Sequence, residues 1–297
     1  MRTSMATWIE AARPKTLWAA VSPVLIGISI AVSSGVFHLL SAVLALVGAI
    51  LIQVGTNFYN DLADFEKGAD TKDRKGPRRA VASGMISQKA MRMATIITFL
   101  AAVLSGAYLM FRGGLPIVAI GVSSILFGLL YTGGKYSLAY LGIADFFVLA
   151  FFGPIAVAGT YYVQALQWPI MVWIAGLAPG LLSVGILLVN NIRDVNEDRA
   201  ANKKTIIVRL GRRFGIEAYL FCMVAAAAVP LVLWQQFEAP ALTLLALIAL
   251  PLFLRGYAQL KRTPASEAMS LNAVLGQTAR NLLVFSVLYS VGWLLSA

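Results

Sequence analysis

Two long stretches of the chain carry no charged side chain. Residues 16–60 contain no Lys, Arg, Asp or Glu over 45 positions, and residues 146–192 contain none over 47. A helix needs about 20 apolar residues to cross a bilayer, so each stretch is long enough for two crossings. The whole chain is only 12% charged, about half the fraction of a soluble domain. The sequence therefore predicts an all-α, polytopic membrane protein with a single domain over residues 1–297.

Nine spanning helices fit the apolar stretches and their interruptions. We expect them at residues 16–36, 39–59, 91–111, 114–133, 143–163, 168–192, 214–236, 240–257 and 274–296. Residues 8–13 are expected to form a short interfacial helix that stops at Pro14. The chain divides into two weakly repeated halves, roughly 16–135 and 143–257, followed by the last helix. Matching helices in two halves favour one site between them, so we expect a central cavity.

Basic residues lie almost entirely on one side of this layout. Of the 24 Lys and Arg residues, all but Arg112 fall in the N-terminal segment, after the second, fourth or sixth helix, or around the end of the eighth. The positive-inside rule then places the N-terminus and these segments in the cytoplasm and the C-terminus outside, across a plasma (inner) membrane. Anionic lipid or an anionic substrate accounts for the net charge of +11, so no nucleic acid is required. The oligomeric state is not indicated.

Eight of the 13 acidic residues stand in two segments that each follow a charge-free stretch. The first, residues 60–74, reads N-D-L-A-D-F-E-K-G-A-D-T-K-D-R, and the second, residues 190–199, reads N-N-I-R-D-V-N-E-D-R. Carboxylates at a membrane boundary are unfavourable unless they bind something. A spacing of four places side chains on one helical face. This groups Asn60 with Asp64, and Asn190 with Asp194 and Asp198.

Two such sets facing each other would form an all-oxygen site suited to Mg²⁺. There is no His or Cys ligand set for zinc or a redox metal. The candidate metal ligands are Asn60, Asp61, Asp64, Asp70, Asn190, Asp194 and Asp198.

Lys and Arg crowd the same two segments. Cations are useful beside a metal when they neutralise phosphate oxygens that the metal leaves free, which favours a diphosphate ligand. The alternative is that both segments are solvated loops balanced by salt bridges. The candidate diphosphate-binding residues are Asn60, Arg78, Arg79, Asn190, Arg193, Arg199 and Lys203.

The acidic segments and the helical layout resemble the UbiA superfamily of intramembrane aromatic prenyltransferases. Several motifs resemble its 1,4-dihydroxy-2-naphthoate polyprenyltransferase branch. They are A-R-P-K-T-L at residues 12–17, G-x-D at 68–70, G-P-x-R at 76–79, G-x-I-S at 84–87, N-N-x-R-D-x-x-x-D-R at 190–199 and K-x-T-x-x-V-R-L-G at 203–211. The resemblance covers nearly the whole chain. Gly68 stands where many members have Asp, and Asp70 is the nearest substitute.

This resemblance implies a polyprenyl diphosphate donor and an aromatic acid acceptor, dihydroxynaphthoate, in menaquinone biosynthesis. Prenyl transfer with loss of CO₂ would give demethylmenaquinol. Mg²⁺ and basic side chains would stabilise the departing diphosphate, and an apolar cavity would shield the allylic cation from water. The chain length of the donor is not indicated.

Catalytic roles are implied for Asp61, Asp64, Asp194, Asp198, Tyr131 and Lys135. Tyr131 and Lys135 form a Y-x3-K element similar to one in parts of the superfamily, although Lys135 is equally explained as a positive anchor. Aromatic rings near the helix ends would stabilise the cation through their faces, or form an interfacial belt. They are Phe58, Tyr59, Tyr131, Tyr136 and Tyr140.

Other functions stay open at this point. Another branch of the superfamily would use 4-hydroxybenzoate, homogentisate, haem or a chlorophyll precursor as acceptor. A cation transporter is disfavoured because the carboxylates stand at helix ends among Lys and Arg. A lipid phosphotransferase would need a D-G-x-x-A-R pattern, which is absent. His38 and Cys222 are predicted to lie far from the acidic segments, which excludes them from catalysis.

Overall fold

Every regular element of the described chain is a helix. The computed structural model describes residues 4–68, 76, 78–134 and 137–297. In chain order, the elements are α1 (Met5–Ala12), α2 (Pro14–Ser33), α3 (Leu39–Glu66), α4 (Gln88–Gly113), α5 (Leu115–Thr132), α6 (Leu138–Leu141), α7 (Ala144–Phe151), α8 (Pro154–Ala165), α9 (Ile170–Arg193), α10 (Val195–Ala200), α11 (Ile206–Gln236), the 3₁₀ helix η1 (Ala241–Ala249), α12 (Leu250–Arg262), the 3₁₀ helix η2 (Ala265–Ser270) and α13 (Leu271–Leu294).

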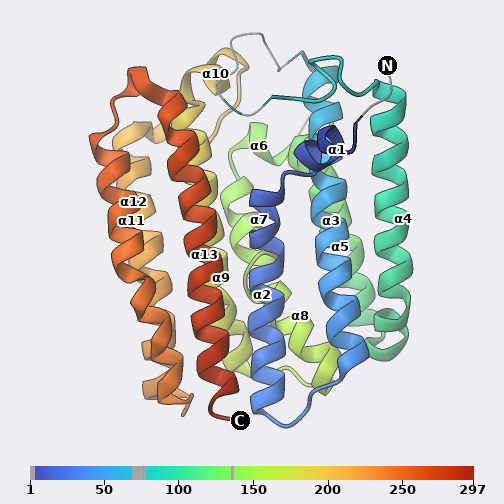
Figure 1. Cartoon of the computed structure of the whole chain (residues 1–297), viewed down its shortest axis with the longest axis vertical. Helices are drawn as coiled ribbons and strands as arrows, with labels where there is room; N and C mark the ends of the chain where they lie inside the picture. The colour runs from blue at the N-terminus through green and yellow to red at the C-terminus, as the bar shows by residue number, and fades with distance from the viewer. Residues whose placement is uncertain (1–3, 69–75, 77, 135–136) are drawn as a thin grey trace.

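The long helices run side by side as one bundle (Figure 1). The short helices α1, α6 and α10 gather at one end of the bundle, where the N-terminus also lies, and the C-terminus is at the other end (Figure 1). The chain passes from α9 directly into α10, so the second acidic segment lies at the end where α1 and α6 are found. We call this the polar end.

Eight segments are long and apolar enough to cross a membrane, which makes this an integral multi-pass membrane protein. They are Pro14–Ser33, Leu39–Glu66, Gln88–Gly113, Leu115–Thr132, Ala144–Ala165, Ile170–Arg193, Ile206–Gln236 and Ala241–Arg262, within the described residues. Each overlaps one of the predicted spans. The ninth predicted span corresponds to α13, which has 24 residues but also contains Gln277, Arg280 and Asn281. Its crossing of the membrane stays a prediction.

Helix α3 is longer than the predicted span of residues 39–59. It continues to Glu66, so the first N-D-x-x-D motif forms the last turns of a helix rather than a loop. His38 begins this helix at the opposite end, where its ring nitrogen accepts a hydrogen bond from the Ser41 backbone N–H at 3.2 Å. The length of α3 therefore carries its carboxylates to the polar end of the bundle.

The single helix expected over residues 143–163 is broken into α7 and α8. Pro154 is the first residue of α8, a position where its missing N–H does no harm. A Cβ on Gly153 would clash with the carbonyl oxygen of Gly176 and the Cα of Gly180. The break therefore lets the chain pack backbone against backbone on α9.

The two sides of the bundle differ in packing. In the most apolar stretch of α2, α9 and α11, 56, 67 and 50% of the residues are buried within the protein. In α3, α4 and α5 the share is only 17, 17 and 11%. The main hydrophobic core accordingly lies among α2, α8, α9, α11, α12 and α13. Helices α3, α4 and α5 instead help to enclose a cavity.

Candidate active site

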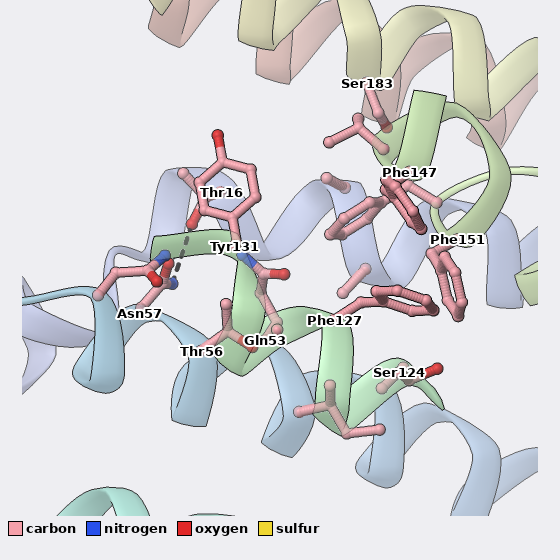
Figure 2. A pocket seen from close by; sticks show the side chains of 18 of the residues that line it. Thr16, Gln53, Thr56, Asn57, Ser124, Phe127, Tyr131, Phe147, Phe151 and Ser183 are labelled. Atoms are coloured by element: carbon pink, nitrogen blue, oxygen red, sulfur yellow. Dashed lines mark hydrogen bonds between the residues drawn. The ribbon is translucent and has the colours of Figure 1, made fainter. Parts of the chain in front are cut away.

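One large cavity of about 790 Å³ runs from the polar end into the bundle. Its walls come from α2, α3, α4, α5, α7, α8, α9 and α13, and α10 and the α1–α2 turn lie at its mouth. Figure 2 shows Thr16, Asn57 and Tyr131 on one side of the space and the rings of Phe127, Phe147 and Phe151 on the other. The cavity thus has a polar part and an apolar part.

The first acidic set reaches the cavity from the end of α3. The Thr132 hydroxyl donates to Asn60 Oδ1 at 2.6 Å, which ties α5 to α3. Asp64 accepts a hydrogen bond from the Arg79 guanidinium, and their side chains are only 6% and 7% exposed. Asn60, Asp64 and Arg79 all line the cavity. A buried arginine thus sits beside a buried carboxylate in the wall of the cavity.

The second acidic set surrounds Arg193, the last residue of α9. Arg193 Nε and Nη2 donate to the two carboxylate oxygens of Asp194 at 2.6 Å each. The same guanidinium donates to Asn190 Oδ1 and to Asn272 Oδ1, both at 2.7 Å. Arg193 is 3% exposed, so these four hydrogen bonds hold a buried charge in a fixed orientation.

Asp198 extends the second set by one turn, on α10. Its carboxylate lies 3.6 Å from Lys203 Nζ, and both residues line the cavity. Burial raises the pKa of Asp198 to about 6, Lys203 lowers it, and the nearby charge of Asp194 raises it further. Burial therefore favours the neutral form of this carboxyl group and moves its change of charge toward neutral pH.

The oxygen donors of both sets suit Mg²⁺, although they do not form a closed cage. No three acidic, histidine or cysteine side chains of the described residues gather closely enough to hold a metal ion. Mg²⁺ typically binds one or two carboxylates and takes its other oxygens from water and phosphate. Asp64, Asp194 and Asp198 open onto one cavity, where water and phosphate oxygens could supply the remaining ligands of a Mg²⁺ ion.

Three predicted site residues are not brought to the cavity. Arg78 and Arg199 are exposed and lie outside the described lining, because their neighbours Arg79 and Asp198 face it instead. Asp61 is buried, with 2% of its surface exposed, but accepts hydrogen bonds from the backbone N–H groups of Ala80 and Val81. The expectation that all three contact metal or diphosphate does not fit this arrangement. Asp70, Lys135 and Tyr136 lie outside the described residues.

The aromatic lining differs from the predicted one. Tyr131 lines the cavity, but Phe58 packs against Trp8 with ring centroids 5.6 Å apart, in a separate cluster under α1. Phe127, Phe147, Phe151 and Phe152 line the cavity with Tyr131. The ring centroid of Phe127 lies 4.5 Å from that of Phe147 and 5.0 Å from that of Phe151. Sequence reasoning missed them because phenylalanine is an ordinary residue of a spanning helix.

Cations at the mouth were also missed. Arg13 and Lys15 line the cavity from the α1–α2 turn, and Asn57 holds this turn by donating to the Ala12 carbonyl at 2.9 Å. Arg13 has a left-handed φ of 53° directly before Pro14, in the A-R-P-K-T-L motif. That motif was the signal that could have located them.

Lys67 and Lys203 flank the ring of Tyr140 at the same end. Their ammonium groups lie 4.5 Å and 5.5 Å from its centroid, and Lys67 also donates to the Thr132 carbonyl. Burial lowers the pKa of Lys67, and Asp64 partly offsets this. One lysine follows each acidic set, so Tyr140 links the two halves through cation–π contacts.

Comparisons with known proteins agree with this geometry. Residues 20–294 match the UbiA prenyltransferase family. The chain is 34% identical to a 1,4-dihydroxy-2-naphthoate octaprenyltransferase of Escherichia coli, over 97% of this chain and 95% of that protein. It is also 34% identical to a protein of the same name from Mycobacterium tuberculosis, over 85% of each chain.

Solved structures share the fold at lower identity. A UbiA homologue from Archaeoglobus fulgidus, bound to GPP and Mg²⁺, superposes with a TM-score of 0.63 at 15% identity, over 97% of this chain and 99% of that one. A digeranylgeranylglyceryl phosphate synthase gives 0.64 at 19% identity, over 98% of both chains.

The fold and cavity define a polytopic helical membrane protein with one amphipathic site between its helices. The family match covers far more than half of the sequence. The chain belongs to the UbiA prenyltransferase family.

Proposed function

We propose that this protein transfers a prenyl chain from a prenyl diphosphate to 1,4-dihydroxy-2-naphthoate in menaquinone biosynthesis. The ring carbon of the acceptor that bears the carboxylate bonds to C1 of the prenyl chain, so the electron pair of its bond to the carboxylate restores the aromatic ring when CO₂ leaves. The C1–O bond breaks, and diphosphate leaves with its electron pair. The ring carboxyl group departs as CO₂, and the product is a demethylmenaquinol. The names of the relatives at 34% identity support this choice of acceptor.

The division of the cavity is the observation that carries the proposal. A prenyl diphosphate has a polyanionic head and a long apolar tail. Asp64, Asp194 and three buried or half-buried cations line the polar part, while helices α3, α4 and α5 line an apolar remainder. The same cavity therefore fits both parts of one substrate. The cations are Arg79, Arg193 and Lys203.

The side chains of both acidic sets would hold Mg²⁺ through oxygen atoms: Asn60 and Asp64 from α3, and Asn190, Asp194 and Asp198 from α9 and α10. Bound Mg²⁺ would supply positive charge that stabilises the leaving diphosphate. Arg79 and Arg193 now pair with carboxylates, and both would turn part of their hydrogen bonding to phosphate oxygens. Asp61, Arg78 and Arg199 are left out of this set.

The apolar part of the cavity would protect the allylic cation. Phe127 and Phe147 line this part of the cavity, and Tyr131 lies across the space from them, next to the polar part (Figure 2). Aromatic faces stabilise cations, and an apolar wall excludes the water that would otherwise capture the carbocation. Lys135 follows Tyr131 by one turn in the sequence and stays a candidate for contact with the diphosphate or acceptor.

The polar end would face the cytoplasm, with the N-terminus on that side and the C-terminus outside. All but one of the 24 basic residues support this orientation through the positive-inside rule. Each of the two halves of the single domain would supply one acidic set, from α3 and from α9. The prenyl tail would then lie within the membrane, while its diphosphate meets the aqueous acceptor at the polar end.

A direct test measures diphosphate release by the purified protein in detergent or vesicles. We expect release only with prenyl diphosphate, 1,4-dihydroxy-2-naphthoate and Mg²⁺ together, in equal amount with prenylated product and CO₂. EDTA should abolish it, and added Mg²⁺ should restore it. Release with 4-hydroxybenzoate or homogentisate instead would assign the protein to another acceptor, and no release with any acceptor would contradict prenyl transfer.

A further inference from the structure

Asp61 is buried beside the site but faces away from it. It follows Asn60 on α3, and successive helical residues point about 100° apart. Asn60 lines the cavity, whereas Asp61 points at a turn that follows the first acidic segment. Asp61 Oδ2 accepts from the Ala80 N–H at 3.0 Å, and Oδ1 accepts from the Val81 N–H at 3.0 Å. Both carboxylate oxygens are thus engaged by backbone.

The surroundings of Asp61 do not suit a metal ligand. Phe58, Leu62, Val81 and Ile86 belong to one buried apolar cluster on this side of α3. A Mg²⁺ ion coordinated there would lie on the side of α3 that packs against this cluster, away from the cavity that Asn60 and Asp64 line. The carboxylate instead satisfies two backbone N–H groups that would otherwise be buried without a partner.

The two hydrogen bonds fix the backbone next to Arg79. The Ala80 N–H belongs to the peptide that joins Arg79 to Ala80, so Asp61 holds that peptide against α3. The Ser83 hydroxyl donates to the Arg79 carbonyl at 2.6 Å and closes the same turn. The Arg79 side chain then reaches Asp64, one turn beyond Asp61 on α3. Helix α3 therefore holds this turn at two points. Asp61 binds the backbone of the turn, and Asp64 binds the guanidinium of Arg79.

We infer that Asp61 is a positioning residue: it anchors the Arg79–Val81 turn so that the Arg79 guanidinium is delivered to the diphosphate end of the cavity. The anchoring rests on the contacts of this chain, and its catalytic consequence rests on the proposed function. The second half contrasts with this arrangement. There the residue after Asn190 is Asn191, which lines the cavity, and the arginine of that set, Arg193, is on the same helix and donates to Asn190.

The test is a double-mutant cycle on the full-length protein. Asp61→Asn replaces one acceptor oxygen by an NH₂ group, which faces a backbone donor. We expect it to raise the KM for prenyl diphosphate about tenfold, with a smaller change in kcat, because it removes a charge-assisted hydrogen bond that holds the turn. In an Arg79→Ala background, Asp61→Asn should change KM no further, because the residue that it positions is gone.

Three controls keep the result interpretable. Thr278→Val removes a buried hydroxyl that lies 3.1 Å from the Tyr219 hydroxyl, outside the cavity lining, and should lower stability without changing KM. The Mg²⁺ concentration for half-maximal rate should shift in Asp64→Asn and not in Asp61→Asn. Ser83 is exposed, so Ser83→Ala should fold even where Asp61→Asn does not, and should raise KM two- to threefold only while Arg79 is present.

Three results would each overturn the inference. The first is that the effects of Asp61→Asn and Arg79→Ala on KM are fully additive. The others are an unchanged KM in Ser83→Ala, and a shift of the half-maximal Mg²⁺ concentration in Asp61→Asn equal to that in Asp64→Asn. An inactive wild-type protein would instead contradict the proposed function.

Discussion

Arg79 and Arg193 each pair with an aspartate in the same cavity, but they are placed there by different means. Arg193 is next to Asp194 in the sequence and makes four hydrogen bonds to side chains of α9, α13 and Asp194 itself. Arg79 lies 15 residues from Asp64, on a separate turn that Asp61 anchors. In the second half the cation, Arg193, is the last residue of a helix. In the first half the cation, Arg79, lies on a separate turn. The first half therefore depends on the fold of that turn, and the second on α13.

The largest expected effect comes from removing the carboxylate of either half. Asp64→Asn and Asp194→Asn keep the side-chain shape but remove a charge that would bind Mg²⁺, so kcat/KM should fall by about a hundredfold or more in each. Diphosphate release at saturating acceptor measures this. Glu217 is a matched control, because its carboxylate accepts a hydrogen bond from the Tyr257 hydroxyl of α12 at 3.2 Å and lies outside the cavity lining, and Glu217→Gln should keep the wild-type rate.

A wild-type rate in either aspartate variant would contradict the proposal that the two acidic sets form one shared site.

A second prediction separates stability from binding. Arg193→Lys loses most of four hydrogen bonds of a buried fork-shaped group, and should lower the free energy of unfolding by roughly 2–4 kcal/mol. Arg79→Lys keeps one charge beside Asp64 and should lower it by about 1 kcal/mol, while raising KM for the donor more than Arg193→Lys does. Thermal unfolding in detergent, run beside donor titrations, compares the two. Equal losses of stability would show that both arginines are held alike.

A third prediction concerns pH and belongs to the second half alone. The pKa of Asp198 is raised to about 6, mainly by burial. In the absence of Mg²⁺, its contribution to stability is therefore complete below the ordinary carboxyl pKa and is lost as pH rises through about 6. Mg²⁺ binds the deprotonated form, so the half-saturating Mg²⁺ concentration should rise up to about tenfold per pH unit below this value.

Rates measured against Mg²⁺ at about pH 5 and about pH 7.5 test this dependence. In Asp198→Asn the half-saturating concentration should be higher throughout and nearly independent of pH over this range. A variant that keeps the wild-type pH dependence would assign the titration to another group.

The smallest effect is expected far from both acidic sets. His38 lies at the opposite end of α3, where its backbone N–H donates to Gln164 at 2.7 Å and its ring stacks on Tyr108 at 6.1 Å. His38→Ala should leave kcat and KM unchanged and cost about 1 kcal/mol of stability through the lost helix cap. A loss of the chemical step in a folded His38→Ala protein would contradict the placement of the site at the polar end.

The fold could be predicted closely because hydrophobic length decides where helices cross a membrane. The eight spanning segments overlap the predicted ones, and α2 and α9 agree within about three residues at each end. The break at Gly153 and Pro154 escaped prediction because apolar residues continue on both sides of it, and the close approach of Gly153 to Gly176 and Gly180 shows what the break allows. The extension of α3 to Glu66 escaped because polarity was read as the end of a helix.

A spacing of four grouped Asn60 with Asp64, and Asn190 with Asp194 and Asp198, and the structure brings both sets to one cavity. Their roles at that cavity stay predictions. Arg78 and Arg199 were predicted to bind diphosphate because of their charge. Each is next to a cavity residue in the sequence but is itself exposed to solvent. Asp61 was predicted as a metal ligand because of its charge. A sequence does not distinguish a carboxylate that accepts backbone hydrogen bonds from one that binds a metal. Which face of the helix each residue occupies had to come from the structure.

The contact between α2 and α13 carries a consequence for how the protein is made. These helices come first and last among the long ones, yet they pack side by side in the bundle (Figure 1). Ribosomes add residues at about 5–20 per second, so α2 emerges some tens of seconds before its partner exists. Until then, the face of α2 that α13 will cover has to be accommodated by lipid or by the insertion machinery. The bundle closes only when synthesis ends.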